Sequence, residues 1–421
     1  MSSSLTMAVL TAPANPAFRQ DPRLARPSQN TPAMSLSSYG RQTIDDADCA
    51  AVLEALRAPQ LTCGPLVARF EAALAGWLGA EHASVCSSGT AALHLAYAAL
   101  GIGEGDEIIT TPITFSATAA AAYYVGANVR IADVDPRTGN LDPRSVEKLI
   151  GNRTRAIVPV HLGGLPADVE DIQALAKQHG LRIVEDACHA LGATYRGRKV
   201  GSLASDATIF SFHPVKHITT GEGGAVIVRD PRLKQRIDRL RHHGVERDAS
   251  RLQTPAAGAW SYEVQELGWN YRLPDFACAL GITQLAKLDD FLARRRRLAA
   301  RYREAIAATF DERVLAPAEL ADRDSAYHLF AVAIDFAKFG TTRAHVVGQL
   351  AAAGVGTQVH YIPLLHHPLH ASRCPHDLAR PHPGADHYYA RTLSLPLHQA
   401  LELADIDVVV AELHKALGGT R

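Results

Sequence analysis

The sequence has no excess of charge of either sign, few cysteines and no long apolar run. Its 421 residues contain 43 Lys and Arg against 43 Asp and Glu, so charge offers no argument for binding nucleic acid or an anionic membrane surface. No apolar run approaches the roughly 20 residues that a membrane-spanning helix needs. The six cysteines are scattered and form no Cys-x-x-Cys pair. This pattern excludes a disulfide framework and indicates reduced thiols in a cytoplasmic protein.

The N-terminal segment 1–38 differs in composition from the rest of the chain. It is rich in Ser, Pro and Ala and has no sustained hydrophobic period, and it lacks the apolar core of a targeting peptide. We expect residues 1–38 to be a disordered tail, or the result of a misassigned start with Met34 as the true initiator. From Tyr39 onward we expect a large domain over 39–285 and a smaller C-terminal domain over 286–421.

Short apolar segments alternate with segments of helical periodicity over the first two thirds of the chain. This alternation predicts an α/β fold with a mostly parallel central sheet that is covered on both faces. Ligands of such sheets collect at the carboxyl ends of the strands. We expect strands at 107–111, 129–133, 155–160, 182–185, 208–212 and 225–228, and helices at 45–57, 66–78, 87–100, 116–125, 142–150 and 168–179.

The C-terminal third has a different pattern, which predicts a smaller α+β domain. It follows a long helical stretch expected over 274–308. That stretch contains four consecutive arginines at 294–297, which we interpret as a solvated helix face. After Pro317 we expect strands near 328–334 and 356–361 and helices near 342–353 and 403–417.

One lysine has an unusual position in the sequence. Lys216 follows the apolar run 207–212 and precedes the Gly-rich segment Gly221-Glu-Gly-Gly224. A lysine held on a rigid scaffold and kept partly dry loses its proton more readily, and the neutral amine can attack a carbonyl. This position suits a Schiff-base lysine, although on local context alone such a lysine is more often a structural ion-pair partner.

Three further features fall near predicted strand ends or helix starts. Gly89-Thr90-Ala91 begins a helix, whose free N–H groups and positive dipole end suit a phosphate. Glu185-Asp186 ends a strand, so a carboxylate there faces the expected ligand crevice. Ser211 lies five residues before Lys216 and offers a hydroxyl. Each feature also has an ordinary structural explanation, such as a helix start packed by small residues or an exposed loop acid.

The order of these features is more specific than any one of them. A phosphate cradle, a strand-end acid and then Ser…Lys-x-x-Thr-x-Gly is expected for a pyridoxal 5′-phosphate (PLP) enzyme. From Tyr39 onward the chain resembles the DegT/StrS family of nucleotide-sugar aminotransferases. The matching stretches are Tyr39-Gly-Arg-Gln42, Ser87-Ser-Gly-Thr-Ala-Ala-Leu93, Thr111-Pro-Ile-Thr-Phe115, Glu185-Asp-Ala-Cys-His189, Ser211-Phe-His-Pro-Val-Lys216 and Gly268-Trp-Asn-Tyr-Arg272. The resemblance implies an aspartate-aminotransferase-like fold, PLP fold type I.

The resemblance also implies roles for particular residues. Lys216 would hold the cofactor as a Schiff base and then act as general acid and base, and Asp186 would pair with the pyridine nitrogen. The ring would lie between Phe115 and His189. The phosphate would be bound by Thr90, Ala91 and Ser211 and, from the neighbouring subunit of a homodimer, by Asn270. The residues expected near the sugar are His213, His360 and Tyr361.

Within the family, the chain looks most like the members of the pseudaminic-acid pathway. The segments that suggest this are 213–224 and Gln358-Val-His-Tyr-Ile-Pro363. The implied reaction transfers the amino group of L-glutamate to C4 of UDP-2-acetamido-2,6-dideoxy-β-L-arabino-hex-4-ulose. One departure is His217, where Pro or Asn is expected; it adjoins the lysine and could alter the loop.

Several other functions are compatible with parts of the sequence. Related dehydratases act on 4-keto sugars with histidine in place of the lysine, but the motif aligns that position with Lys216. The amino acceptor could be another UDP- or dTDP-linked keto sugar, including a 3-keto sugar. Seven histidines between 360 and 387 raise a metal-binding alternative, but no paired Cys set or His-Glu-x-x-His motif accompanies them, and we expect no metal. A regulatory relative that binds the cofactor without turnover is a further alternative.

Overall fold

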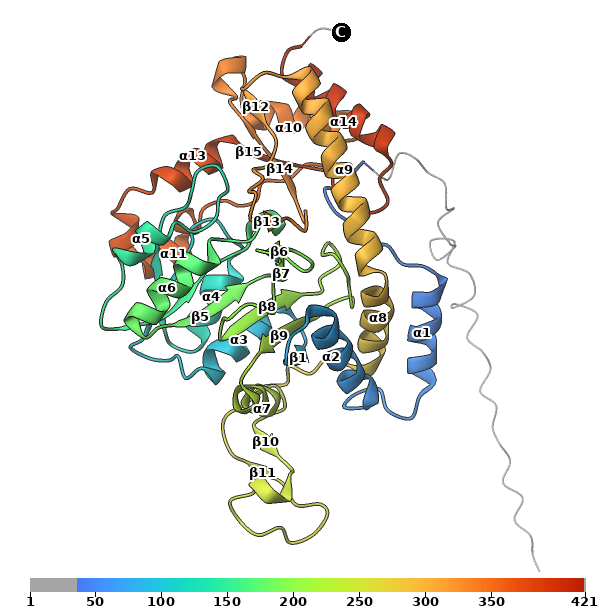
Figure 1. Ribbon diagram of the computed structural model, residues 1–421, viewed down its shortest axis with the longest axis vertical. Coiled ribbons are helices and arrows are strands. Elements are labelled where there is room, and N and C mark those ends of the chain that lie inside the picture. Colours follow the sequence, from blue (N-terminus) through green and yellow to red (C-terminus); the bar gives the residue numbers. More distant parts are fainter. Residues whose placement is uncertain (1–35, 420–421) are drawn as a thin grey trace, which may run out of the picture.

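The computed structural model describes residues 36–419, so most of the predicted tail at 1–38 lies outside the described residues. The described chain contains a seven-stranded sheet with the order β1-β9-β8-β5-β4-β2-β3 (Figure 1). The strands β8, β5, β4, β2 and β3 run parallel, whereas β9 and β1 are antiparallel to their neighbours. The prediction of a mostly parallel α/β sheet is therefore confirmed. The seven strands are β1 (His82–Cys86), β2 (Glu107–Thr110), β3 (Asn128–Ile131), β4 (Thr154–Val158), β5 (Arg182–Asp186), β8 (Ala207–Ser211) and β9 (Gly224–Val228).

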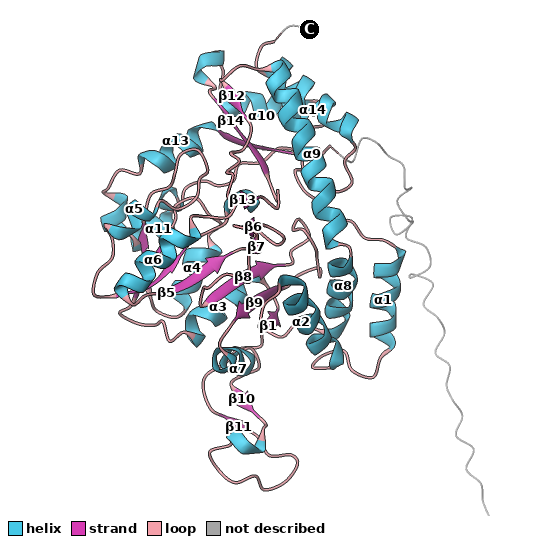
Figure 2. Ribbon diagram, in the orientation of Figure 1, coloured by secondary structure: helices cyan, strands magenta, loops and turns pink. Residues whose placement is uncertain are grey.

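Both faces of the sheet are buried, because successive side chains on each strand enter different hydrophobic clusters. In β9, Val226 and Val228 belong to one cluster, while Ala225 and Ile227 belong to another. Helices cover both faces of the sheet, as Figure 2 shows. The first cluster includes α3 (Gly89–Ala99), α4 (Ala117–Tyr124) and α7 (Pro231–Leu240); on the opposite face lie α2 (Pro65–Leu78) and α8 (Asp275–Ala286) beside β8 and β9, and α5 (Pro143–Glu147) and α6 (Val169–His179) beside β4 and β5.

A separate hydrophobic cluster forms in the C-terminal part of the chain. Its residues come from helices around the three-stranded sheet β12-β14-β15. Leu36, at the start of the described chain, packs against this cluster. The C-terminal elements are α9 (Leu288–Thr309), β12 (Val314–Leu315), β14 (Phe330–Ile334), α10 (Arg343–Ala352), α11 (Pro368–Arg373), α12 (Pro375–Leu378), α13 (Pro383–Arg391), β15 (Thr392–Leu395) and α14 (Leu403–Ala416).

Several local expectations were wrong. The segment 356–361 forms no strand and makes only an isolated bridge between Gln358 and Ser394. The long helix over 274–308 is interrupted at Lys287. The side chain of Lys287 is drawn to Asp45 and Asp48 at the start of α1 (Asp46–Arg57), with Nζ–O distances of 2.8 and 2.6 Å. The sequence pattern also gave no indication of β1.

The arginine run at 294–297 is a solvated face only in part: Arg296 and Arg297 are exposed, whereas Arg294 is half-buried. Arg295 is 0% exposed, while Arg294 donates to Leu401 O and Arg296 donates to Gly192 O. Arg295 is embedded because α9 lies across the junction between the sheet and the C-terminal cluster, where carbonyl groups rather than water surround its guanidinium. At Arg295, the tertiary structure has therefore overridden the usual preference of arginine for solvent.

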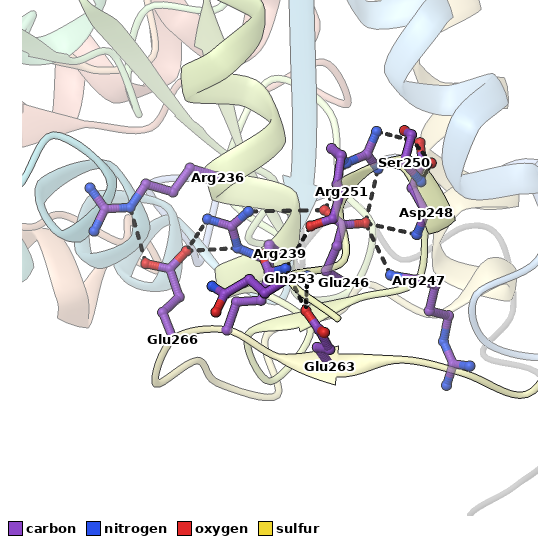
Figure 3. Close-up of polar contacts among 11 residues, drawn as sticks. Arg236, Arg239, Glu246, Arg247, Asp248, Ser250, Arg251, Gln253, Glu263 and Glu266 are labelled. Carbon is purple, nitrogen blue, oxygen red and sulfur yellow. Dashed lines mark hydrogen bonds and ion pairs between the residues drawn. The ribbon is translucent and has the colours of Figure 1, made fainter. Parts of the chain in front are cut away.

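A two-stranded arm projects from the molecule between α7 and α8 (Figure 1). It consists of β10 (Val245–Glu246) and β11 (Glu263–Val264). Ion pairs at its base connect the arm to α7: Glu266 pairs with Arg236 and Arg239, at 3.1 and 2.6 Å (Figure 3). Trp260, between the two strands of the arm, and Leu267, at its base, are 75% and 85% exposed.

The short sheet β13-β6-β7 connects the two parts of the chain. It pairs β13 (Arg323–Asp324) with β6 (Thr194–Tyr195), which pairs in turn with β7 (Arg198–Lys199). Among residues 36–419, no helix is long and apolar enough to cross a membrane.

Candidate active site

A cavity of about 790 Å³ opens at the carboxyl ends of β5 and β8. Its position follows from the topology, because the loops after parallel strands meet at the same edge of the sheet. The cavity brings together nine of the residues that the sequence singled out: Thr90, Phe115, Asp186, His189, Ser211, His213, Lys216, His360 and Tyr361.

Lys216 lies on the tight turn that follows β8. Its amide donates to His213 O at 2.9 Å, and Phe212 is anchored through its amide to Gly223 O at 2.8 Å. Burial lowers the pKa of the Lys216 ammonium, while Cys188 and Asp186 act in the opposite direction. Within the part of the chain that the structure describes, Lys216 Nζ forms no hydrogen bond or ion pair. An amine with a lowered pKa and no competing partner is suited to nucleophilic attack on a carbonyl.

Asp186 ends β5 and is held by two hydrogen bonds. Thr118 Oγ1 donates to Asp186 Oδ2 at 2.7 Å, and the Cys188 amide donates to Asp186 Oδ1 at 3.2 Å. The preceding Glu185 points to the other face of the sheet, where it pairs with His161 Nε2 at 2.8 Å. Strand alternation therefore assigns Asp186 to the cavity and Glu185 to the interior.

The start of α3 forms one wall of the cavity. Ser88 caps the helix by accepting from the Ala91 amide at 3.0 Å. The amides of Gly89 and Thr90 are in the first turn and have no acceptor inside the helix, so they are available to an anion. Ala91 departs from the sequence expectation: it does not line the cavity, and its amide is already used by Ser88. Ser211 Oγ lies beside this helix start, near Gly89.

The backbone of β9 approaches the start of α3 very closely. A Cβ added at Gly224 would overlap Ser88 O and lie 2.7 Å from Gly89 N. We therefore expect Gly224→Ala to displace the helix start, to lower the free energy of unfolding by about 1–3 kcal/mol and to weaken cofactor binding. Thermal unfolding and a spectroscopic PLP titration measure both effects. The control is Gly76→Ala in α2, where a Cβ meets no atom within 4 Å and a modest stabilisation is expected. Unchanged stability and PLP affinity in Gly224→Ala would contradict the prediction.

His189 and Phe115 lie on the cavity wall with Tyr361. His189 Nδ1 accepts from the Gly163 amide at 3.4 Å, and His189 Nε2 lies 3.0 Å from the Tyr361 hydroxyl. Burial, followed by Lys216, holds the pKa of His189 well below its usual range. The neutral ring with an accepting Nδ1 carries its proton on Nε2, so Nε2 donates to Tyr361. Phe115 is 61% exposed at the cavity mouth.

The remaining predicted residues differ in their surroundings. His360 is buried, and its Nδ1 lies 2.9 Å from Ser394 Oγ; burial and the nearby Lys216 lower the pKa of His360 to about 3. His213 is exposed at the cavity rim. Asn270 lies outside the cavity, exposed at the base of the arm, where its backbone bridges to His242.

His217, the departure in the lysine motif, faces away from the cavity. It is buried, and its Nε2 donates to Ala326 O at 3.0 Å. The histidine therefore ties the lysine turn to the segment that precedes β14.

The sequence reasoning gave no role to Tyr39, which lines the cavity, or to Thr118, which is buried behind Asp186. Tyr39 packs edge-on against His360, with ring centroids 4.9 Å apart. Thr118 orients Asp186 although 68 residues separate them. Tyr39 begins a stretch that matched the family pattern, which was the available signal. Thr118 had no signal, because its role depends on the packing of α4 against β5.

The histidines between 360 and 387 have separate partners. His370 Nε2 lies 2.8 Å from Ser116 Oγ, and His382 Nε2 donates to Ile131 O at 3.3 Å. Among residues 36–419, no group of three or more His, Cys, Asp or Glu side chains is arranged to hold a metal ion.

Comparisons with known proteins identify the family of the chain. Residues 42–414 match the DegT/DnrJ/EryC1/StrS aminotransferase family. The chain belongs to this family. The resemblance found in the sequence is thus confirmed, and so is the expectation of an aminotransferase.

Two relatives and a solved structure illustrate the similarity. The spore coat polysaccharide biosynthesis protein SpsC of Bacillus subtilis is 39% identical over 386 residues, covering 91% of this chain and 97% of SpsC. The UDP-4-amino-4,6-dideoxy-N-acetyl-β-L-altrosamine transaminase of Campylobacter jejuni is 40% identical over 384 residues, covering 90% and 97%. The structure of Helicobacter pylori PseC, an aminotransferase of pseudoaminic acid biosynthesis, is 33% identical with a TM-score of 0.82, covering 90% and 99%.

Enzymes of this DegT-type family depend on PLP, and the predicted cofactor is confirmed. The residues of this cavity fit that group. Lys216 offers an amine, Asp186 offers a carboxylate held in a fixed orientation, and the helix start at Gly89 and Thr90 offers unpaired amides for a phosphate.

Proposed function

We propose that this sugar aminotransferase transfers the amino group of L-glutamate to C4 of a UDP-linked 4-keto-6-deoxy-N-acetylhexosamine. The sugar is UDP-2-acetamido-2,6-dideoxy-β-L-arabino-hex-4-ulose, and the pathway is pseudaminic acid biosynthesis. The convergence of Lys216 and Asp186 on one cavity supports the amino transfer. The 40% identity to the C. jejuni transaminase supports the choice of sugar.

Lys216 is the residue that moves protons. When bound, the cofactor supplies a carbonyl for amine exchange and a ring that withdraws electrons from the adjacent carbon. The neutral amine of Lys216 takes the proton from Cα of glutamate, and in the second half-reaction the ammonium delivers a proton to complete amination at C4 of the sugar. A lysine with a lowered pKa is suited to both directions of transfer.

Asp186 holds the ring nitrogen in its protonated form. A carboxylate beside a pyridinium stabilises the charged state, which is the state that withdraws electrons most strongly. Thr118 and the Cys188 amide orient the carboxylate. Both of its oxygens accept hydrogen bonds from the protein, so it stays in place as the substrates exchange.

The cavity walls position the phosphate and the ring of the cofactor, and they also position the sugar. Thr90, Ser211 and the first-turn amides of α3 bind the phosphate, while His189 and Phe115 flank the ring. The residues nearest the sugar are His213, His360 and Tyr361. The rigid contacts of His189 and His360 support these roles, because side chains fixed by other protein groups lose little entropy on binding.

The active unit is a homodimer in which Asn270 reaches the phosphate of the partner's site. Asn270 is exposed outside its own cavity, at the base of an arm with large exposed apolar side chains. Exposed apolar clusters of this kind are typical of surfaces that bind another protein.

The unpaired cysteines support a cytoplasmic location, where thiols remain reduced.

Mixing of variants tests whether Asn270 acts across subunits. We expect Asn270→Ala to weaken PLP binding by about 10-fold or more, because a hydrogen bond to a charged phosphate is lost. At limiting PLP, co-refolding Asn270→Ala with Lys216→Ala should restore about a quarter of the wild-type activity, since half of the dimers are mixed and one of their two sites is intact. Mixing Lys216→Ala with Asp186→Asn is the control and should restore nothing. Equal recovery in both mixtures, or in neither, would contradict the cross-subunit role.

Product identification tests the proposed reaction. The enzyme is incubated with PLP, L-glutamate and the UDP-4-keto sugar, and the product is identified by mass spectrometry and NMR. A 4-amino sugar formed with 2-oxoglutarate supports the proposal. A sugar that has lost a hydroxyl group and has gained no amino group would indicate dehydration. A panel of UDP- and dTDP-linked 3- and 4-keto sugars distinguishes the other possible amino acceptors. Cofactor binding without conversion of any sugar would indicate a regulatory relative.

A further inference from the structure

A single buried guanidinium on α9 donates hydrogen bonds to two separate segments of the chain, 327–328 and 397–399. Arg295 of α9 donates through Nη1 to Leu397 O at 2.9 Å and Tyr327 O at 3.1 Å, with His328 O at 3.4 Å. Through Nη2 it donates to Gln399 Oε1 at 3.3 Å. The Leu397 amide in turn donates to Tyr39 O, which belongs to a cavity-lining residue.

Arg295 has no acidic partner among residues 36–419. Burial lowers the pKa of its guanidinium to about 10, so the group is still charged at neutral pH. Only carbonyl and amide oxygens compensate this charge. Burying an unpaired charge is costly, and an apolar side chain of similar size would fill the space at a lower cost. A contribution to the free energy of unfolding therefore does not explain why an arginine is buried at this position.

Gln399 connects Arg295 to the turn that carries the lysine. Its Nε2 donates to His217 O at 3.2 Å while its Oε1 accepts from Arg295. A guanidinium can only donate and a carbonyl can only accept, so these two partners determine the orientation of the amide. His217 O belongs to the residue directly after Lys216.

The lysine turn is held at a second point by the His217 side chain. Its Nε2 donates to Ala326 O at 3.0 Å, in the segment that leads to the carbonyls bound by Arg295. In the same segment, the ring of His328 lies 4.4 Å from the ring of His189, which lines the cavity. The Arg295 guanidinium is thus connected to the lysine turn through Gln399 and to the cavity wall beside His189 through His328.

We propose that Arg295 is a positioning residue for Lys216, which it holds through the Gln399 amide and the His217 carbonyl. The guanidinium determines where the lysine amine stands relative to Asp186 and the helix start at Thr90. This inference rests on the proposed role of Lys216, and it adds a residue on α9 that does not line the cavity.

Gln399→Glu separates positioning from structural support. A carboxylate keeps the acceptor for Arg295 and supplies its missing counter-charge, so the melting temperature should be equal to or above that of the wild type. The same change removes the donor to His217 O and places an acceptor against it. We expect pyridoxal 5′-phosphate to attach to Lys216 of the cofactor-free variant about 10-fold more slowly, because a small displacement of a reacting group has a large kinetic cost.

The glutamate half-reaction provides a second readout. Without keto sugar, the saturating rate of amino transfer from L-glutamate to the bound cofactor should fall by about 10-fold or more, while the half-saturating glutamate concentration changes less than about 3-fold. Tyr302→Phe is the matched control. Tyr302 lies two turns further along α9 and donates to Pro396 O at 2.8 Å, so the variant loses a buried hydrogen bond near Leu397 but leaves the Gln399 connection intact.

The measurements have distinct outcomes. A stable Gln399→Glu variant with slow attachment and slow transfer, beside a Tyr302→Phe variant with normal rates, supports the proposal. Normal rates in Gln399→Glu would overturn it, leaving Arg295 as a structural anchor only. If Gln399→Glu does not fold, Gln399→Met is judged by the same two rates. Attachment of PLP to Lys216→Ala at the wild-type rate would instead refute the role of Lys216 itself.

Discussion

Replacing Lys216 with alanine is expected to lower the rate of amino-sugar formation by about 10⁴-fold or more. The change removes both the amine that attaches to PLP and the group that moves the substrate proton, and proton transfer alone contributes about 10²–10⁴-fold in enzymes. Lys216→Arg should be as inactive, because a guanidinium keeps its proton at neutral pH. Steady-state assay of the 4-amino sugar measures the effect.

Chemical labelling of the lysine accompanies this assay. Borohydride should fix PLP covalently to the wild type but not to Lys216→Ala, and peptide mapping should place the label on Lys216. Lys199→Ala is the control: Lys199 Nζ donates to Trp77 O outside the cavity, so its loss should change turnover little. Near-normal turnover of Lys216→Ala would refute the catalytic assignment.

Asp186→Asn is expected to lower turnover by about 10²–10³-fold, the range typical for loss of one preorganised electrostatic contact. The amide has the same shape and can still bond Thr118 and accept from the Cys188 amide. The variant therefore loses charge rather than position, and the ring nitrogen loses the anion that keeps it protonated. The rate of the glutamate half-reaction measures the change.

Two controls isolate the charge of Asp186. Glu185→Gln changes the adjacent residue, which faces the opposite side of β5 and pairs with His161; it should reduce stability but leave the half-reaction largely intact. A PLP analogue methylated on the ring nitrogen has a permanent positive charge, so it should recover part of the rate in Asp186→Asn. A full wild-type rate in Asp186→Asn with ordinary PLP would show that the carboxylate is not needed.

Much of the fold could be predicted from sequence because it depends on local periodicity. Six strands of the mostly parallel sheet were expected close to where β2, β3, β4, β5, β8 and β9 lie. The segment 356–361 was misassigned, since an apolar run resembles a strand whether or not a neighbour pairs with it. Only Gln358 finds a bridging partner there.

The candidate site was predictable to a similar degree. Lys216, Asp186, Thr90 and Ser211 follow strands or begin helices, and the sheet topology then brings them to one cavity. Ala91 was not distinguishable from its neighbours, because the use of its amide depends on the rotamer of Ser88. No sequence pattern indicated a role for Thr118, because Asp186, which it orients, is far away in sequence.

By itself, the sequence determined which chemical groups this aminotransferase has and in what order, because motifs depend on covalent spacing. It therefore sufficed for the family, the cofactor and the parallel sheet. The tertiary structure alone decided the surroundings of these groups: that Glu185 faces the interior while Asp186 faces the cavity, and that Arg295 is buried at a junction of carbonyl groups. Such surroundings arise from contacts between distant segments, which no local pattern records.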